Sequence, residues 1–185
     1  MDLLKRITDK EICGTEGITQ STPRKCVRIV LLDDNNKVAI LHLGKFDFYT
    51  VPGGGVDGCE SLEQAAMREA IEETGCKCKI IHPIGIIEEN GAHYDWVNES
   101  FCYIAQVKGS KGIPDMTSEE IEEETQVRWY DFHEALQIIK NQTINEQGRV
   151  GYIMRFVRER DKVMLNEAFY LLHIGVPEAK MEMYL

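Results

Sequence analysis

Three glutamates, Glu69, Glu72 and Glu73, have the spacing of side chains that share one face of a helix. At about 100° per residue they fall within an arc of about 100°, and the alanines and other apolar residues of 65–71 occupy a separate arc. Carboxylates three and four residues apart repel one another by a few tenths of a kcal/mol per pair, so the arrangement favours a bound cation. Because oxygen ligands suit hard divalent ions, the stretch predicts a site for Mg²⁺, with Mn²⁺ as a substitute.

A divalent ion at this place would let an acidic chain act on an anionic substrate. The sequence has 21 basic against 31 acidic residues and a formal net charge of -10, which opposes long-range attraction to phosphate groups. A bound metal ion neutralises phosphate charge locally, activates water and stabilises a leaving group. The glutamates therefore indicate hydrolysis at a phosphate centre.

The glutamates are expected on a helix over residues 62–74 that follows a tight loop. Ser61 and Gln64 form a capping-box pattern at the start of the helix, and Gly75 ends it as a left-handed cap. Before the helix, Pro52 precedes three consecutive glycines, which permit backbone conformations that other residues avoid.

The remaining chain supplies a sheet and further helices. The first two dozen residues read as a lead-in or edge segment, and the last third is helical in pattern. We expect an α/β (α+β) fold with a mixed sheet and helices against its faces. The predicted strands are 26–32 and 37–43, joined as a hairpin by a turn at 33–36, then 48–51, 79–87, 99–107 and 126–130; the predicted helices are 132–140 and 152–173.

Composition indicates a single globular domain. The 185 residues are 43% hydrophobic and 28% charged, and no apolar run approaches the roughly 18 to 20 residues that cross a bilayer. Six cysteines without a Cys-x-x-Cys pair predict reduced thiols, and the N-terminus lacks the pattern of a secretory signal, so we expect a cytoplasmic location. The acidic charge balance argues against DNA or a membrane as partner.

One further pattern identifies a family. Seven residues between positions 54 and 76 have a long fixed spacing, which resembles the signature of the MutT/Nudix hydrolases: Gly54, Glu60, Arg68, Glu69, Glu72, Glu73 and Gly75. The chain departs from the family only in aliphatic preferences, at Ala70 and Cys76. The resemblance extends over residues 25–140 and implies the family's α/β/α sandwich. We expect one domain over residues 1–185, with a core at about 25–140 and a helical C-terminal extension at about 141–185.

The resemblance also implies an activity and a set of site residues. Family members hydrolyse a nucleoside diphosphate linked to another group, with a divalent cation, usually Mg²⁺, and water attacking phosphorus. Glu69 and Glu72 are the alternative candidates to position or deprotonate that water. The implied residues are the catalytic and metal-binding glutamates Glu69, Glu72 and Glu73, the backbone carbonyl of Gly53 as a further metal ligand, and the structural supports Gly54, Glu60, Arg68 and Gly75, among which Arg68 and Glu60 would form a salt bridge.

Substrate selection is expected from residues outside this stretch. His93, Tyr94 and Trp96 are candidates to stack on a base or to bind phosphates. Tyr94 resembles a tyrosine of relatives that act on dinucleoside polyphosphates, and the proline that marks many ADP-ribose hydrolases is absent. An additional carboxylate is expected from one acidic run, whose members are otherwise solvated: Glu119, Glu120, Glu122, Glu123 and Glu124.

The basic and apolar residues of the tail leave two alternatives open. Arg155, Arg158 and Lys162 share a helix face and, together with Arg149 and Arg160, read as a solvated face rather than as phosphate ligands. The apolar residues of the same helix either pack on the domain or form a homodimer contact.

Two other function classes share this fold. A non-catalytic nucleotide-sensing module would usually lack some of the carboxylates that this chain retains. An isoprenoid-diphosphate isomerase would need a cysteine and glutamate pair that is not evident. The sequence leaves open the nucleotide derivative, the general base, the number of metal ions and the oligomeric state.

Overall fold

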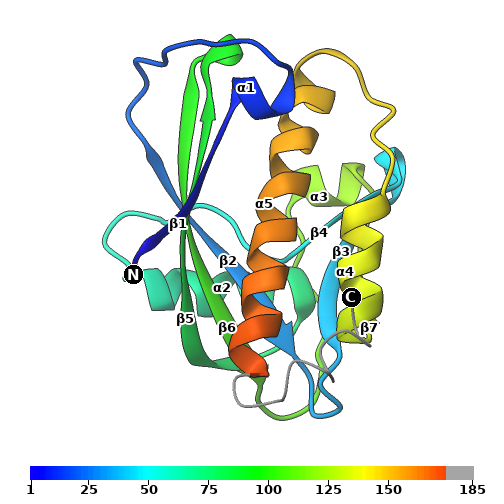
Figure 1. Ribbon diagram of the computed structural model, residues 1–185. Coiled ribbons are helices and arrows are strands. Elements are labelled where there is room, and N and C mark those ends of the chain that lie inside the picture. The colour runs from blue at the N-terminus through cyan, green and yellow to red at the C-terminus, as the bar shows by residue number, and fades with distance from the viewer. Residues whose placement is uncertain (174–185) are drawn as a thin grey trace.

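The computed structural model describes residues 1–173 as a mixed β-sheet with helices on both faces (Figure 1). In chain order the elements are β1 (Leu3–Thr8), α1 (Asp9–Ile12), β2 (Arg24–Leu32), β3 (Val38–Leu43), the 3-10 helix η1 (Gly44–Phe46), β4 (Phe48–Thr50), α2 (Leu62–Thr74), β5 (Cys78–Gly91), η2 (Ala92–Tyr94), β6 (Trp96–Val107), α3 (Ser118–Glu122), β7 (Thr125–Tyr130), α4 (Phe132–Asn141) and α5 (Gly148–Leu172). The α/β fold class predicted from the sequence is confirmed.

The seven strands form one sheet in the order β1-β5-β6-β2-β3-β4, with β7 also paired to β3. The β1–β5 and β2–β6 pairs are parallel, and the other pairs are antiparallel. The β2–β6 ladder runs without interruption from Arg24 opposite Asn98 to Leu32 opposite Gln106. The edge segment expected before residue 24 is β1, which lies beside β5.

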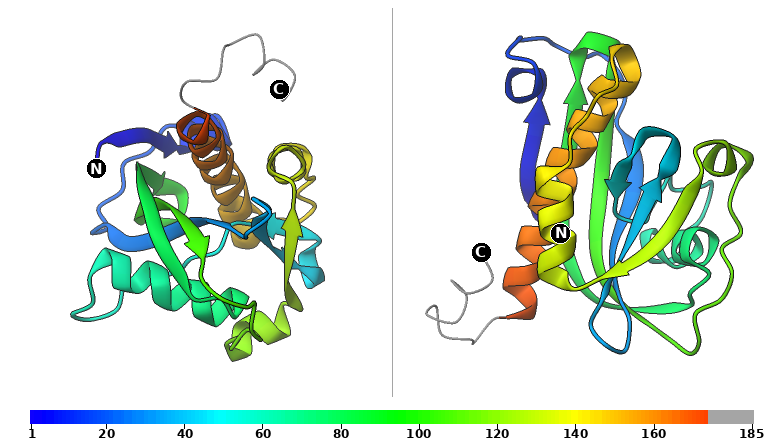
Figure 2. Two further views of the ribbon diagram at one scale, coloured as in Figure 1. Left: turned by 90° about the horizontal axis from the view of Figure 1, so that it is seen from below. Right: turned by 90° about the vertical axis from the view of Figure 1, so that its right-hand side faces the viewer.

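Strand β2 divides its side chains between two cores, because successive residues point to opposite faces of a sheet. Val27, Ile29 and Leu31 pack with the alanines of α2, whereas Val30 and Leu32 pack with α4 and α5. Figure 2 shows α2 on one side of the sheet and α4 and α5 on the other. Fully burying one aliphatic side chain contributes about 1.5–3 kcal/mol, so both helix layers are held firmly.

The predicted hairpin between β2 and β3 is wrong in its pairing, although its turn is present. Only Leu32 and Val38 pair between the two strands, and β3 otherwise pairs with β4 and β7. The reason is that the glycine loop occupies the free edge of β2. The N–H groups of Val27 and Ile29 donate to the carbonyl oxygens of Gly54 (2.9 Å) and Pro52 (2.9 Å) instead of to β3.

Helix α5 is one unbroken helix of 25 residues that packs on its own sheet. Of the apolar residues predicted either to pack on the domain or to form a dimer contact, Tyr152, Phe156, Leu165 and Phe169 are buried, whereas Leu172 is 40% exposed. The helix starts at Gly148, four residues before the predicted start. The last part of the predicted C-terminal extension, residues 174–185, lies outside the described residues. Within residues 1–173, no helix is both long and apolar enough to cross a membrane.

Candidate active site

The glycine loop brings the sheet and α2 together at one point. The N–H of Gly53 donates to Oε2 of Glu73 at 2.6 Å, and a Cβ at Gly54 would lie 2.4 Å from Oε1 of Glu69. Gly53 has φ +138°, and a Cβ there would lie 2.1 Å from the carbonyl oxygen of Val27 in β2. Only glycine fits this position, because the loop runs directly against the strand.

The helix that carries the glutamates has the predicted caps. Oγ of Ser61 accepts from the N–H of Gln64 (3.2 Å), and the Gln64 side chain accepts from the N–H of Ser61 (2.8 Å). Gly75 ends the helix with φ +69°. These two caps fix where α2 begins and ends, and hence which of its side chains face the loop.

Arg68 connects the loop before α2 to the glutamates of the helix through hydrogen bonds. Its guanidinium donates to both oxygens of Glu60 (2.8 and 3.2 Å) and to the carbonyl oxygen of Gly55 (2.9 Å). The bridge to Glu60 is the one that the family resemblance implies, and it lowers the pKa of Glu60. Nη1 of the same arginine also donates to Glu69 and Glu72, each at 2.8 Å. Although helix periodicity sets Arg68 outside the arc of the glutamates, its long side chain reaches two of them.

Glu73 and Glu69 are buried carboxylates whose charge is only partly compensated. Burial raises the pKa of Glu73 well above its ordinary value, although the hydrogen bond from Gly53 opposes the shift. Burial also raises the pKa of Glu69, against the opposing effect of Arg68. Among the described residues, Glu73 has no ion-pair partner, so a cation at this place would lower the cost of its charge.

The chemistry of these side chains fits a hard divalent ion, but their arrangement is not that of a closed metal site. Within residues 1–173, no three carboxylate, imidazole or thiol groups converge on one point. The three glutamates do not converge because Arg68 donates hydrogen bonds to Glu69 and Glu72, whereas Glu73 accepts from the glycine loop. A cation would therefore have to replace Arg68 at one of these carboxylates.

A cleft of about 380 Å³ opens beside Glu73, between the sheet and α5. Gly53 and Glu73 line one end, and Phe46, Phe48 and apolar residues of α5 line the walls. Clefts of this size and mixed lining are typical of small-molecule sites, in which apolar walls hold a flat group and a few polar groups fix its orientation.

The structure places two of the five candidate carboxylates in this cleft, Glu119 and Glu123. Burial raises the pKa of Glu123. Glu120 instead accepts from Thr117 and caps α3, Glu122 is exposed, and Glu124 packs against Gly44.

The three aromatic candidates are divided between two other cavities. His93 and Tyr94 line one with Tyr152, away from the loop. Trp96 lines a second, which shares lining residues with the cleft. The structure thus does not bring His93 or Tyr94 to the wall of the cleft that holds Glu73.

A buried charge cluster fixes α5 against the cleft. Arg160 is only 2% exposed and pairs with Asp161 (2.7 Å) and Glu89 (3.7 Å), whereas the sequence predicts a solvated arginine. Asp161 also accepts from the hydroxyl of Thr50 (2.7 Å) and the N–H of Val51 (3.2 Å) in the strand region next to the loop. By contrast, Arg158 and Lys162, predicted on the solvated face, pair with Glu159.

Sequence reasoning missed the arginines that face α5 from β2 and the phenylalanines of the cleft. Arg24 and Arg28 alternate with Cys26, Val30 and Leu32 on one face of β2. Charged residues at strand positions that should face a core are a signal that could have been found in the sequence.

Known proteins resemble parts of this chain. A family model described as the NUDIX domain matches residues 22–149. An RNA pyrophosphohydrolase of a Wolbachia species from Brugia malayi is 48% identical over 63 residues, which are 31% of this chain and 37% of that protein. An 8-oxo-dGDP phosphatase of Danio rerio is 30% identical over 108 residues, 57% of this chain and 31% of that protein.

Solved structures share the fold at low sequence identity. A NUDIX hydrolase from Nitrosomonas europaea superposes with a TM-score of 0.55 at 20% identity, over 78% of this chain and 95% of that one. A UDP-X diphosphatase has a TM-score of 0.54 at 14% identity, over 84% and 66% of the two chains. The matched regions cover 31% to 57% of the lengths of the curated relatives.

Proposed function

The chain belongs to the NUDIX domain family, and on this premise we propose that it is a pyrophosphohydrolase of a nucleotide derivative. It would use a divalent ion, Mg²⁺ or in its place Mn²⁺, and split a nucleoside diphosphate derivative into a nucleoside monophosphate and a phosphorylated remainder. The observation that carries the proposal is Glu73, a buried carboxylate that has no ion-pair partner within residues 1–173 and accepts a hydrogen bond from the glycine loop beside a cleft.

Each residue of the site has a separate task in this proposal. Glu69, Glu72, Glu73 and the carbonyl of Gly53 would hold the ion, which when bound supplies charge neutralisation for the phosphates and activation of water. Gly53 N–H keeps the Glu73 carboxylate aimed at the loop. Glu69, with its pKa raised by burial, is suited to accept a proton from the attacking water, and Glu72 is the alternative.

The cleft provides the other half of the site. Phe46 presents apolar surface on which a base could stack, while Glu119 or Glu123 would add a carboxylate to the cleft that Glu73 lines. The names of the relatives support RNA or 8-oxo-dGDP as candidate substrates. All six cysteines are free, which supports our proposal of a reducing, cytoplasmic location.

The substitution Glu73→Gln tests the function, because it removes one charge and almost no volume. We expect turnover to fall by more than about 100-fold with Mg²⁺ present, while circular dichroism and the melting temperature show a folded protein. Glu63→Gln is the matched control, since Glu63 lies exposed in the first turn of the same helix.

The substrates to assay are nucleoside triphosphates with ordinary and oxidised bases, dinucleoside polyphosphates, ADP-ribose, nucleotide sugars, coenzyme A and RNA with a 5′-triphosphate, each with Mg²⁺ and with Mn²⁺. Full activity of Glu73→Gln would refute the role of Glu73. Nucleotide binding without turnover of any substrate would refute the hydrolase and favour a sensor.

A further inference from the structure

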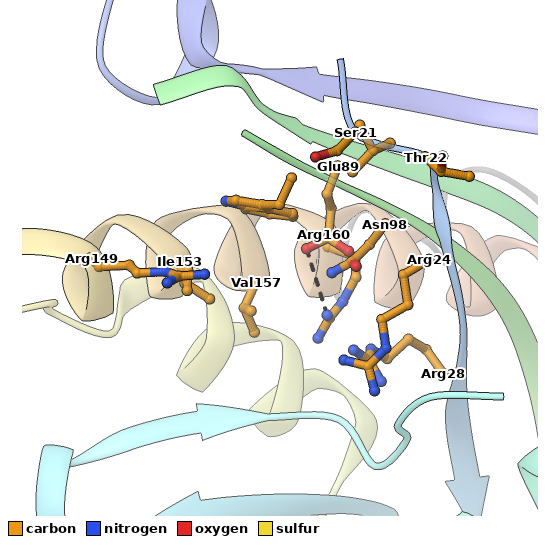
Figure 3. Close-up of a pocket in the computed structure, with 12 residues that line it drawn as sticks. Ser21, Thr22, Arg24, Arg28, Glu89, Asn98, Arg149, Ile153, Val157 and Arg160 are labelled. Carbon is orange, nitrogen blue, oxygen red and sulfur yellow. Dashed lines mark ion pairs between the residues drawn. The ribbon is translucent and has the colours of Figure 1, made fainter. Parts of the chain in front are cut away.

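A second cavity, of about 400 Å³, continues the cleft along α5 and is lined by arginines (Figure 3). Arg28, Ile153, Val157 and Arg160 line both cavities, so the two are neighbouring lobes of one groove. We call the second cavity the arginine lobe; the charged residues that line it are Arg24, Arg28, Arg149, Arg160 and Glu89.

Two of these arginines occupy strand positions that face the α5 layer. Arg24 and Arg28 point to the same side of β2 as Val30 and Leu32, which pack in the core under α4 and α5. In Figure 3 both side chains extend from β2 toward Arg160 of α5. The sheet thus presents guanidinium groups where its pattern would otherwise bury apolar side chains.

Most of this positive charge has no acidic partner in the part of the chain that the structure describes. Among the described residues, Arg24, Arg28 and Arg149 have no carboxylate within 4.0 Å, whereas Arg160 is paired with Asp161 and Glu89. The whole chain has a net charge of -10, so three unpaired arginines around one cavity are opposite in sign to the rest of the molecule. Such a cavity attracts an anion.

Two buried hydrogen-bond donors at the arginine lobe have no acceptor among residues 1–173. They are Nε of Arg28 and Nε1 of Trp96, and both residues line the lobe. Nε1 of Trp96 packs against Gly91 of β5, so it faces that strand rather than the open lobe. A buried donor without an acceptor costs about 1–3 kcal/mol, so a ligand with several acceptor oxygens would gain from meeting Nε of Arg28. This observation is independent of the charge count and points to the same kind of ligand.

The arginine lobe begins directly at the glycine loop. A terminal nitrogen of Arg24 lies 2.4 Å from the position that a Cβ of Gly55 would take, and the preceding residue, Gly54, faces Glu69 in the same way. Arg28 lines both lobes and also acts electrostatically on Glu69 and Glu73. An anion in the lobe would therefore be continuous with the phosphates held at the glutamates.

From this placement we infer that the arginine lobe is a second phosphate subsite, which binds the phosphates that lie beyond the scissile bond. The inference rests on the proposed function for the position of that bond. It assigns the substrate to the class of nucleotide oligophosphates, with three or more consecutive phosphates, carried by a free nucleotide or by the 5′ end of an RNA. Guanidinium groups suit this ligand, because their planar donors bind phosphate oxygens in pairs.

Binding of inorganic tripolyphosphate to the metal-free protein tests the subsite without any turnover. Calorimetry in EDTA at low ionic strength should show that Arg24→Gln and Arg28→Gln each weaken binding by about tenfold. Lys25→Gln is the matched control, because Lys25 lies between them in the sequence and points to the opposite face of β2. We expect the control to change affinity by less than about twofold, because the Lys25 side chain lies on the face of the sheet opposite to the lobe and cannot touch the ligand.

Two results would overturn the inference. One is that the unaltered protein does not bind tripolyphosphate, and the other is that the arginine variants bind it as strongly as Lys25→Gln does. Arg24 is exposed, so its variant keeps the test valid if Arg28→Gln fails to fold.

A second measurement separates the inference from the proposed function and identifies the source of the phosphates. We expect Arg24→Gln to lower kcat/KM by about tenfold for a nucleoside triphosphate or a 5′-triphosphate RNA, and to change it little for a nucleotide sugar. A preference for either of the first two substrates supports the inference and names its source. Equal losses on all three substrates would overturn it. An inactive protein that still binds tripolyphosphate through Arg24 would refute only the hydrolase.

Discussion

Replacing Asp161 with asparagine tests whether the buried charge cluster holds α5 in place. Asp161 is fully buried, and both of its carboxylate oxygens accept hydrogen bonds. Oδ1 accepts from Nε (2.8 Å) and Nη2 (2.7 Å) of Arg160, and Oδ2 accepts from the hydroxyl of Thr50 and the N–H of Val51. An asparagine amide has one oxygen, so its NH₂ group must face another donor. Among residues 1–173, Arg160 would then keep Glu89, at 3.7 Å, as its one anionic partner.

The expected loss of stability is about 3–5 kcal/mol, the usual cost of removing one partner from a buried ion pair. At about 2–4 °C per kcal/mol for a chain of this size, the melting temperature should fall by roughly 6–20 °C. Urea unfolding at pH 7 measures the free energy directly. Glu89→Gln is the matched control and should cost about 1 kcal/mol, because the shorter Arg160–Asp161 contact stays intact.

A double-mutant cycle adds the single variant Arg160→Met and the double variant Arg160→Met, Asp161→Asn. The double variant should be more stable than the sum of the two single effects predicts, since neither charge is then left without its partner. The reasoning fails if Asp161→Asn costs less than about 1 kcal/mol, or no more than Glu89→Gln.

Two further substitutions test the turn and the glycine loop. Burial alone would raise the pKa of Asp33, but hydrogen bonds from Lys111 and from the backbone of its own turn outweigh it and lower the pKa. The stability that this adds is present above the ordinary pKa of 3.8 and is lost as the pH falls through the lower folded value, so Asp33→Asn should destabilise at pH 7 and much less at pH 2 in urea unfolding. Gly53→Ala should cost more than about 2 kcal/mol, because its Cβ would collide with Val27. Gly58→Ala, with φ +40° and open space, should cost about 1–2 kcal/mol by the same thermal melt, and equal losses would contradict the collision.

Local signals in the sequence predicted the elements that carry the candidate site. Ser61, Gln64 and Gly75 define α2 through hydrogen bonds between near neighbours, so their pattern can be interpreted without knowing the rest of the fold. The turn after β2 is local in the same sense, since Asp33 accepts from the N–H groups of Asn35 and Lys37. The roles of the glutamates remain predictions.

Pairing between distant segments could not be predicted in this way. Whether β2 takes β3 or the glycine loop at its edge depends on Val27 and Ile29 meeting Pro52 and Gly54, which no local pattern encodes. The burial of Arg160 likewise depends on distant residues, because its partner Asp161 is held by Thr50 and Val51, more than 100 positions earlier, and a buried guanidinium is tolerable only beside a buried acid. The arginine lobe exists only once β2 and α5 are packed.

The parallel pairing of β2 with β6 also has a consequence for the folding of the chain. Arg24 of β2 pairs with Asn98 of β6, and Leu3 of β1 pairs with Ile86 of β5. Neither pair of strands can form until the ribosome has added more than 70 further residues. Closing such long loops costs entropy before any contact repays it, which makes folding slow. A nascent chain that ends before β6 would expose the apolar faces of β2 without a partner strand. We therefore expect the segment that carries the glutamates to acquire its final position late, in one cooperative step with the sheet around it.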